Sequence, residues 1–370
     1  MKKIILSLAS GLVLCVSACT GNTPKAAQTD CAIHAEAADP ALSAAIDTLV
    51  DSAVARGFAG GVAVMRDGVL VYSRTAGSAS LSEDIPVTEE TLFEVASVTK
   101  YFTAVLVMKA AEEGKFSLND SIAVLAPDTR LAARGVTYFD LLSHQSGLGS
   151  TYVAEETTDG DAALAAIDKT EIDEEKVGGF RYSNDGYDLL GVLLERVYGQ
   201  TYETLLQEKI FAKACLTHAS HWSLVDLTNP HIVAQPLTPF PETLRPRNYG
   251  MLASAGLLIS VADLARFEKA LSNGSIINAD SRQEMLAPRG DTRIGPATFG
   301  AFLTDAGLAG RRLRALGSED WGDNAAMHHY LDKNVIVAVV TSRGPAEETG
   351  EPMFRNELTE AIEAVLFAAD

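Results

Sequence analysis

The patterns typical of β-strands lie near the two ends of this 370-residue chain, and most patterns between them are helical. Near the start, two stretches of alternating apolar residues flank the turn pair Asp67-Gly68, which predicts a β-hairpin. Near the end, residues 335–340 form an unbroken apolar run, as expected of a buried central strand. The sequence therefore predicts an α+β fold, in which an antiparallel sheet built from both chain ends is flanked by helices and a mostly helical domain is inserted.

The expected boundaries follow from this pattern. Asp39-Pro40 predicts a helix N-cap with proline at the first helical position, so the folded unit, residues 40–370, begins there. We assign residues 40–94 and 273–370 to the sheet part and residues 95–272 to the helical part. A ligand site is expected in a cleft at their junction.

Residues 1–18 carry two lysines followed by a short apolar core, which predicts a secretory signal peptide. The end of this segment, Val16-Ser17-Ala18-Cys19, resembles the bacterial lipobox, in which small residues precede a cysteine that receives lipid. Cys19 is then the expected lipidation site, and residues 19–39 form a linker. This predicts an exported bacterial lipoprotein whose lipid anchor holds it in a bilayer, on the periplasmic face of a membrane. An ordinary signal peptide with an incidental cysteine is the alternative.

The charge of the chain excludes one class of partner. The formal net charge is -19, and a protein that binds nucleic acid needs clustered Lys and Arg for phosphate contacts. We therefore expect no nucleic-acid partner. Cys31 and Cys215 can pair in an oxidising compartment, and two free thiols are the alternative.

The first candidate for chemistry is Ser97-Val98-Thr99-Lys100. Positions three apart share one face of a helix, so Lys100 would point the same way as Ser97. A serine hydroxyl needs a base to become a nucleophile, and a lysine among apolar neighbours can supply that base. Alone, the pattern equally fits a surface serine that begins a core helix.

The second candidate is Tyr182-Ser183-Asn184. A tyrosine near a lysine can pass protons between a nucleophile and a leaving group. An asparagine amide can hold a substrate carbonyl. Alone, this tripeptide equally fits a helix N-cap.

Four segments together are more specific, and they occur in one order along the chain. The nucleophile segment of class C β-lactamases, related esterases and penicillin-binding proteins is similar to residues 93–104. The "LLxHxSGL" segment of that family resembles residues 141–148, its Tyr-x-Asn region resembles residues 180–186, and its later "aGGlxSTxxDL" segment resembles residues 255–264. The resemblance covers roughly residues 40–370.

The resemblance implies a β-lactamase-like fold and a reaction through an acyl-enzyme. It implies that Ser97 is the nucleophile, Lys100 its base and Tyr182 the second proton carrier, and that Asn184 positions the substrate. The implied substrate is a small ester or amide, and no metal or organic cofactor is required. His144 invites a Ser–His interpretation, but the family segment uses this histidine structurally and the chain has no Gly-x-Ser-x-Gly elbow.

The third family motif is altered in this chain. The family has Lys or His, any residue, then Gly on a strand that lines the site, and the corresponding stretch here begins Leu316-Gly317-Ser318. Aligning Gly322 with a later family glycine places Leu316 at the cationic position and Ser318 at the glycine. The resemblance implies an oxyanion hole made of two backbone N–H groups, with Ser97 as the first donor and, in this alignment, Glu319 as the second.

The altered motif changes the expected substrate. Without the cation, a substrate carboxylate loses a charge-assisted hydrogen bond of about 1.5–3 kcal/mol. Esters without a carboxylate lose less, so we expect a serine esterase rather than a β-lactamase or D-alanyl peptidase. The alternative is a catalytically impaired envelope lipoprotein that binds cell-wall or acyl ligands, because a side chain at Ser318 would crowd the site.

Overall fold

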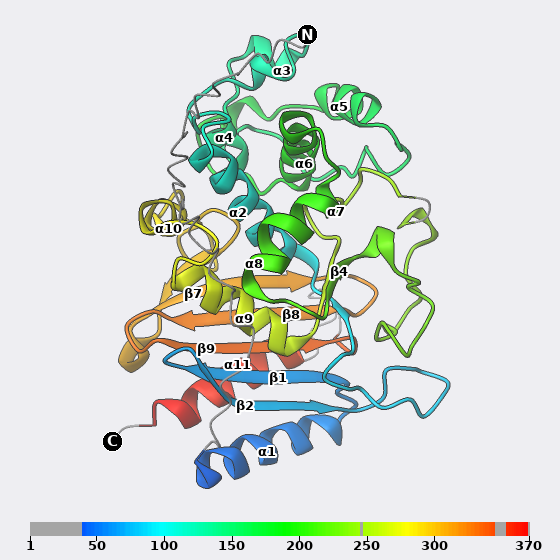
Figure 1. Ribbon diagram of the computed structural model, residues 1–370, viewed down its shortest axis with the longest axis vertical. Helices are drawn as coiled ribbons and strands as arrows, with labels where there is room; N and C mark the ends of the chain where they lie inside the picture. Colours follow the sequence, from blue (N-terminus) through cyan, green and yellow to red (C-terminus); the bar gives the residue numbers. More distant parts are fainter. Residues whose placement is uncertain (1–38, 245–246, 345–352, 369–370) are drawn as a thin grey trace, which may run out of the picture. The chain divides into compact units, whose positions relative to one another are not determined.

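The computed structural model describes residues 39–244, 247–344 and 353–368. These residues belong to one compact unit, Cys31–Asp370. Its main sheet is antiparallel and six-stranded, in the order β2-β1-β9-β8-β7-β6 (Figure 1). The strands are β1 (Gly60–Arg66), β2 (Val69–Ala76), β6 (Phe302–Asp305), β7 (Arg311–Ser318), β8 (Asn324–Tyr330) and β9 (Val335–Thr341).

The sheet joins the two ends of the chain, as the sequence predicted. Strand β9 lies between β1 and β8, and its residues are buried along the whole strand. Alternate residues of a strand face opposite sides of a sheet. Val337 and Val339 therefore pack in one core with Val62, whereas Ala338 and Val340 pack in a second core with Ala63.

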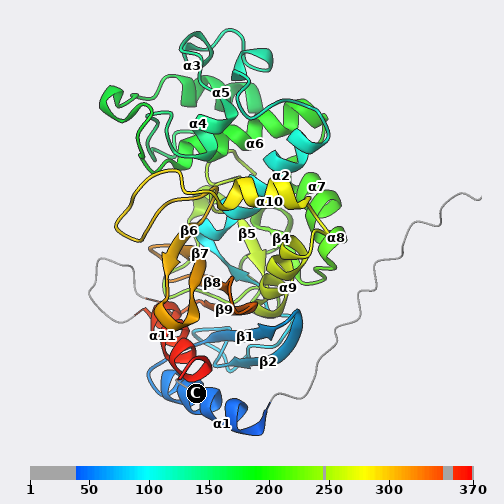
Figure 2. The same ribbon diagram turned by 90° about the vertical axis from the view of Figure 1, so that its left-hand side faces the viewer.

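Helices cover both faces of this sheet (Figure 2). The first core is closed by α1 and α11, and the second by α9 and the helical part. The helices are α1 (Pro40–Val54), α2 (Thr99–Glu112), α3 (Arg130–Ala133), α4 (Tyr138–Leu142), α5 (Gly160–Asp168), α6 (Asn184–Tyr198), α7 (Tyr202–Leu205), α8 (Ala212–Ala214), α9 (Val261–Ser272), α10 (Ala279–Leu286) and α11 (Phe354–Leu366).

A small second sheet connects the two parts. It pairs β3 (Phe93–Glu94) and β4 (Ala219–His221) with β5 (Leu257–Ile259). We expected the helical part to extend to residue 272, but α9 packs against β1 and β9 and so belongs with the sheet. Helical periodicity in the sequence does not distinguish a helix that covers a sheet from a helix inside a bundle, so it could not place this boundary.

The predicted α+β fold class, with an antiparallel sheet built from both chain ends, is confirmed. The predicted signal peptide, the linker, Cys19 and Cys31 lie outside the described residues. Cys215 takes part in a disulfide, and its partner also lies outside them. No helix in the described part of the chain is both long enough and apolar enough to span a bilayer.

Candidate active site

Ser97 lies where the small sheet leads into the long buried helix. Strand β3 is followed by one 3-10 turn, η1 (Ala96–Val98), and then by α2. Ala96 has a φ of +48°, and its N–H donates to Glu94 Oε1 at 2.8 Å, which fixes this tight turn. Eleven residues of α2 are buried, so the helix that carries the site is held on all sides. The predicted helix is therefore present, and the 3-10 turn that leads into it presents Ser97.

The amine of Lys100 reaches Ser97. Lys100 Nζ lies 3.1 Å from Ser97 Oγ and donates a hydrogen bond of 2.8 Å to the carbonyl of Ser254. The side chain of Lys100 is 2% exposed, and no carboxylate forms an ion pair with it within the described residues. The rings of Tyr182 and Tyr187 lie 4.8 Å and 5.9 Å from Nζ, which encloses the amine between two aromatic faces.

The phenol of Tyr182 reaches the same hydroxyl. Tyr182 OH donates to Ser97 Oγ at 2.7 Å. The structure thus brings together Ser97, Lys100 and Tyr182 from separate segments, within the range in which protons pass between heavy atoms.

His144 holds Tyr182 in place. Its ring stacks on the Tyr182 ring at 4.7 Å, and its Nδ1 accepts the N–H of Ser183 at 3.0 Å. Burial and the positive charge of Lys100 lower the pKa of His144 to about 3, so the ring is neutral at pH 7. His144 forms no hydrogen bond to Ser97 among the described residues, in agreement with a structural rather than a base-like role.

Strand β7 passes beside Ser97 at very close range. A Cβ on Gly317 would lie 2.0 Å from the carbonyl oxygen of Val95, so only glycine fits there. Gly317 is therefore the strand glycine that lets β7 approach the nucleophile turn. The alignment above places Ser318 at this glycine and Leu316 at the cationic position, each one residue too far along the chain, so Ala315 occupies the cationic position.

The second oxyanion donor also differs from the expectation. The N–H of Glu319 donates to the carbonyl of Asp323 at 2.9 Å, inside the β7–β8 hairpin, so it is not free to face a substrate. Backbone groups alternate in direction along an antiparallel strand, so the N–H of Ser318 points away from β8. Strand β6 pairs with β7 only from Arg311 to Arg314, which leaves this edge open at Ser318.

An open cleft of about 960 Å³ surrounds Ser97. Leu316 and Ser318 line it together with Ser97, as predicted, because alternate residues of β7 share one face. The other lining residues are Lys176, Phe180, Tyr182, Asp291, Thr292, Arg293, Ile294, Phe302, Gly317 and Arg355.

Asn184 lies near Ser97, Lys100 and Tyr182, but it does not line the cleft. Its Nδ2 donates to Tyr152 OH, and no hydrogen bond joins it to Ser97 or Lys100 within the described residues. Its Oδ1 is buried and has no hydrogen-bond partner there. An unpartnered buried acceptor is unfavourable, so this atom is the one part of Asn184 that remains available to a ligand.

Asp188 is a functional candidate that the sequence reasoning missed. Its carboxylate accepts the N–H groups of Met251, Ala253 and Ser254 at 3.0–3.1 Å, and the Ser254 hydroxyl at 3.1 Å. The carbonyl of Ser254 in turn accepts from Lys100. Asp188 thus holds the turn that orients the amine, including Met251 with its φ of +61°. The available signal was an acid four residues after Asn184, and therefore on the same face of α6 as Asn184.

Two buried carboxyl groups, Glu94 and Asp323, interact electrostatically with the partly buried Glu319 at the end of β7. Burial and the neighbouring carboxylates raise the pKa values of Glu94 and Asp323 well above their usual range, and burial raises that of Glu319 to about 8. Asp323 is 0% exposed, and neither of its oxygens has a hydrogen-bond partner among the described residues. The cluster therefore retains protons at pH 7.

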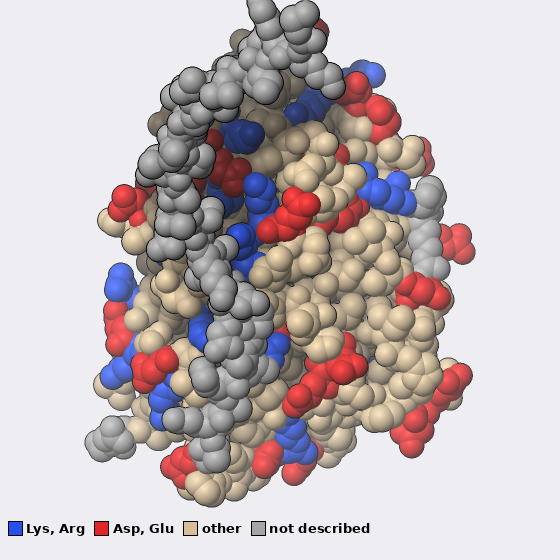
Figure 3. Space-filling view, in the orientation of Figure 1, with Lys and Arg blue, Asp and Glu red and all other residues tan. Residues whose placement is uncertain are grey.

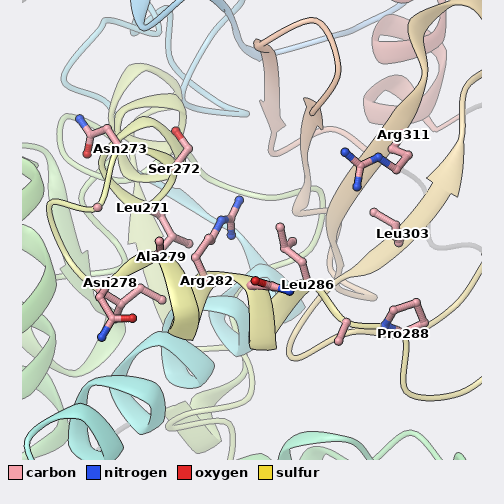
Figure 4. Close-up of a pocket in the computed structure, with 14 residues that line it drawn as sticks. Leu271, Ser272, Asn273, Asn278, Ala279, Arg282, Leu286, Pro288, Leu303 and Arg311 are labelled. Carbon is pink, nitrogen blue, oxygen red and sulfur yellow. The ribbon is translucent and has the colours of Figure 1, made fainter.

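A second cavity, of about 710 Å³, lies between α10 and the Arg311 end of β7 (Figure 4). Its lining contains no carboxylate, histidine, lysine or tyrosine. Arg282 lines it, but its guanidinium donates to Glu268 and to Tyr101 OH in a buried network. This cavity therefore offers no group that could activate a nucleophile.

The fold and the group formed by Ser97, Lys100 and Tyr182 define a serine hydrolase of the kind that includes β-lactamases and penicillin-binding proteins. The chain belongs to the Beta-lactamase family, whose model matches residues 42–361.

Several known proteins are similar to this chain in sequence or in structure. Penicillin-binding protein 4* of Bacillus subtilis is 26% identical over 342 residues, which cover 84% of this chain and 72% of the relative. Protein flp of Staphylococcus aureus is 26% identical over 186 residues, but the match spans only 37% of its length. The D-amino acid amidase of Ochrobactrum anthropi SV3 has a similar structure, with a TM-score of 0.75 at 22% identity over 89% of this chain and 98% of that one.

Proposed function

We propose that the chain is an esterase that forms an acyl-enzyme on Ser97. The observation that carries this proposal is that one hydroxyl, Ser97 Oγ, is within hydrogen-bond distance of both the Lys100 amine and the Tyr182 phenol. Because Gly317 is the strand glycine, the uncharged Ala315 stands where the family has a cation, which supports an ester rather than a β-lactam or a D-alanyl peptide.

The proposed reaction uses these groups in sequence. Lys100 takes the proton of Ser97 while Oγ attacks the ester carbonyl. The N–H groups of Ser97 and Ser318 hold the oxyanion, and a missing donor of this kind typically costs roughly 10²–10³ in rate. Tyr182 gives its proton to the leaving alkoxide and recovers one from Lys100. Water then releases the acyl group by the same steps in reverse order.

The test is hydrolysis of p-nitrophenyl butyrate by the protein without residues 1–18 and by its Ser97→Ala variant. We expect turnover that disappears in the variant. A fluorophosphonate probe should label the parent and leave Ser97→Ala unlabelled. If parent and variant both match the buffer blank, the chain is not an esterase of this kind.

The second candidate is a binding protein with an impaired site. The loss of the cation of the family motif favours it, because Ala315 stands at that position. Folded protein that neither labels with the fluorophosphonate nor hydrolyses the ester, yet still binds acyl ligands, would support this candidate over the esterase.

We also propose that the chain is exported and lipid-anchored through Cys19, with its cleft in the periplasm. Support comes from the small residues before Cys19. Full-length protein expressed in bacteria with labelled palmitate should incorporate the label, and Cys19→Ala should not. Ser97→Ala is the matched control and should keep the label.

A further inference from the structure

We propose that the cleft selects esters carrying an anionic carboxylate, which Lys176 and Arg293 recognise from two loops that border it. This proposal rests on the esterase proposed above and specifies its substrate class. Both residues line the cleft that contains Ser97. Both are exposed, and neither has an ion-pair partner within the described residues.

The charge of the cleft is opposite to that of the chain. The protein has a formal net charge of -19, yet three basic residues and one acidic residue, Asp291, line this cleft. Figure 3 shows several basic side chains in the hollowed upper part of one face, where acidic side chains are also present. A concave surface of one sign raises the local concentration of ligands of the other sign.

The two loops are fixed relative to the catalytic group. Lys176 ends the 3-10 turn η3 (Glu174–Lys176), and Arg293 lies in the loop between α10 and β6 (Figure 2). Gln145 joins these loops, because its carbonyl accepts the N–H of Gly178 at 2.9 Å and its Nε2 donates to the carbonyl of Arg289 at 2.8 Å. Gln145 follows His144, which stacks on Tyr182.

The loop that carries Arg293 is also internally ordered. Its base is closed by the pairing of Gly290 with Ala297, and the N–H of Ala297 donates to Gly290 at 2.7 Å. At its tip, the hydroxyl of Thr292 donates to the carbonyl of Gly295 at 2.6 Å and accepts the N–H of Ile294 at 3.1 Å. A cation on a preorganised loop loses less conformational entropy on binding.

The rest of the cleft fits an apolar chain that ends in a charge. Phe180, Ile294, Phe302 and Leu316 supply apolar surface, and the uncharged Leu316 lies on β7 beside Ser97. The anion-binding groups thus lie on the loops instead of on the strand, so an anionic substrate is compatible with the altered strand motif.

The experiment compares matched ester pairs. One pair differs in the acyl group, p-nitrophenyl hemiglutarate against p-nitrophenyl butyrate. The other differs in the leaving group, 4-(butanoyloxy)benzoate against its methyl ester. We expect a higher kcat/KM for the anionic member of at least one pair. The ratio of kcat/KM for the anionic ester to that for the neutral ester should fall about three- to tenfold in Arg293→Gln or Lys176→Gln, and further in the double variant. The same ratio should fall when NaCl is raised from 20 to 500 mM, since salt screens exposed charges.

The control is Lys333→Gln, which makes the same charge change in the turn between β8 and β9, at the end of the sheet opposite Ser318. It should leave both ratios unchanged. A readout without turnover is the rate at which a fluorophosphonate labels Ser97. Glutarate should slow labelling of the parent more than glutaramide does, and this difference should shrink in the double variant.

The outcomes separate the two proposals. Ser97-dependent hydrolysis with equal rates for both members of both pairs, or ratios that the Gln variants do not change, overturns the anion preference and leaves the esterase standing. Absence of both hydrolysis and labelling overturns the esterase and the anion preference with it.

Discussion

Asn in place of Asp188 should disconnect the Lys100 amine from the turn that holds it. In the structure, Oδ1 of Asp188 accepts the N–H groups of Ala253 and Ser254, and Oδ2 accepts the N–H of Met251 and the Ser254 hydroxyl. An amide oxygen can keep the first pair of bonds. The amide nitrogen would face the N–H of Met251, which leaves that donor unpaired.

The magnitudes follow from these bonds. A buried unpaired N–H costs about 1–3 kcal/mol of unfolding free energy. If Lys100 also loses its charge-assisted bond to Ser254, worth about 1.5–3 kcal/mol, kcat/KM should fall roughly tenfold to a hundredfold. Burial raises the pKa of Asp188 to about 7, so protonation should impose the same defect on the parent below this pH. The parent should therefore show an acidic limb in kcat/KM near pH 7 that Asp188→Asn lacks.

Asp185→Asn is the matched control. Asp185 is buried on the same helix and accepts bonds from the N–H and hydroxyl of Thr151 and the N–H of Tyr152, none of which leads to Lys100. Urea unfolding should show comparable losses for both variants, and p-nitrophenyl butyrate assays from pH 5.5 to 9 should show the missing limb only in Asp188→Asn. An Asp188→Asn enzyme with the parental limb and plateau would refute the positioning role.

Three other changes test separate features. Glu319→Gln should flatten the pH dependence of stability. Because the folded state raises the pKa of Glu319 to about 8, this residue favours folding most below about pH 4, and its contribution is lost as the pH rises to 8, at up to about 1.4 kcal/mol per pH unit. The free energies of urea unfolding at pH 6 and pH 8.5 should therefore differ less in the variant than in the parent. Gly317→Ala should lower kcat at least about a hundredfold, because its Cβ would push β7 away from Val95; unaltered kcat would contradict the close approach. His144→Asn should lower kcat with little change in KM and give no new titration near pH 6.5; if activity instead vanishes completely, His144 acts as more than a support for Tyr182.

Periodicity and local motifs predicted the parts of this molecule that depend on neighbouring residues. The hairpin around Asp67-Gly68 and the strand from residue 335 are present, because turn chemistry and apolar runs act locally. The meeting of Ser97, Lys100 and Tyr182 was expected from family resemblance, since no spacing along the chain brings residue 182 to residue 97.

The incorrect predictions concern features that depend on strand register or on packing between distant segments of the chain. Whether the N–H of Ser318 or Glu319 faces the cleft depends on which residues of β7 bond to β8, and a shift of one residue reverses the answer. The role of Asp188 depends on a turn more than sixty residues away, which no local pattern reveals. The loops that carry Lys176 and Arg293 are likewise joined through Gln145, which is distant in sequence from the second of them.

The position of β9 has a consequence for how the chain is synthesised. Strand β1 is complete after residue 66, but one of its two partners begins at residue 335, so its backbone N–H and C=O groups on that edge have no strand to pair with until nearly the whole chain has left the ribosome. Strand pairing over such a long sequence separation forms slowly, and until it forms the unpaired edge of β1 is prone to aggregation. A nascent or truncated chain that lacks the last strand should therefore depend on a chaperone.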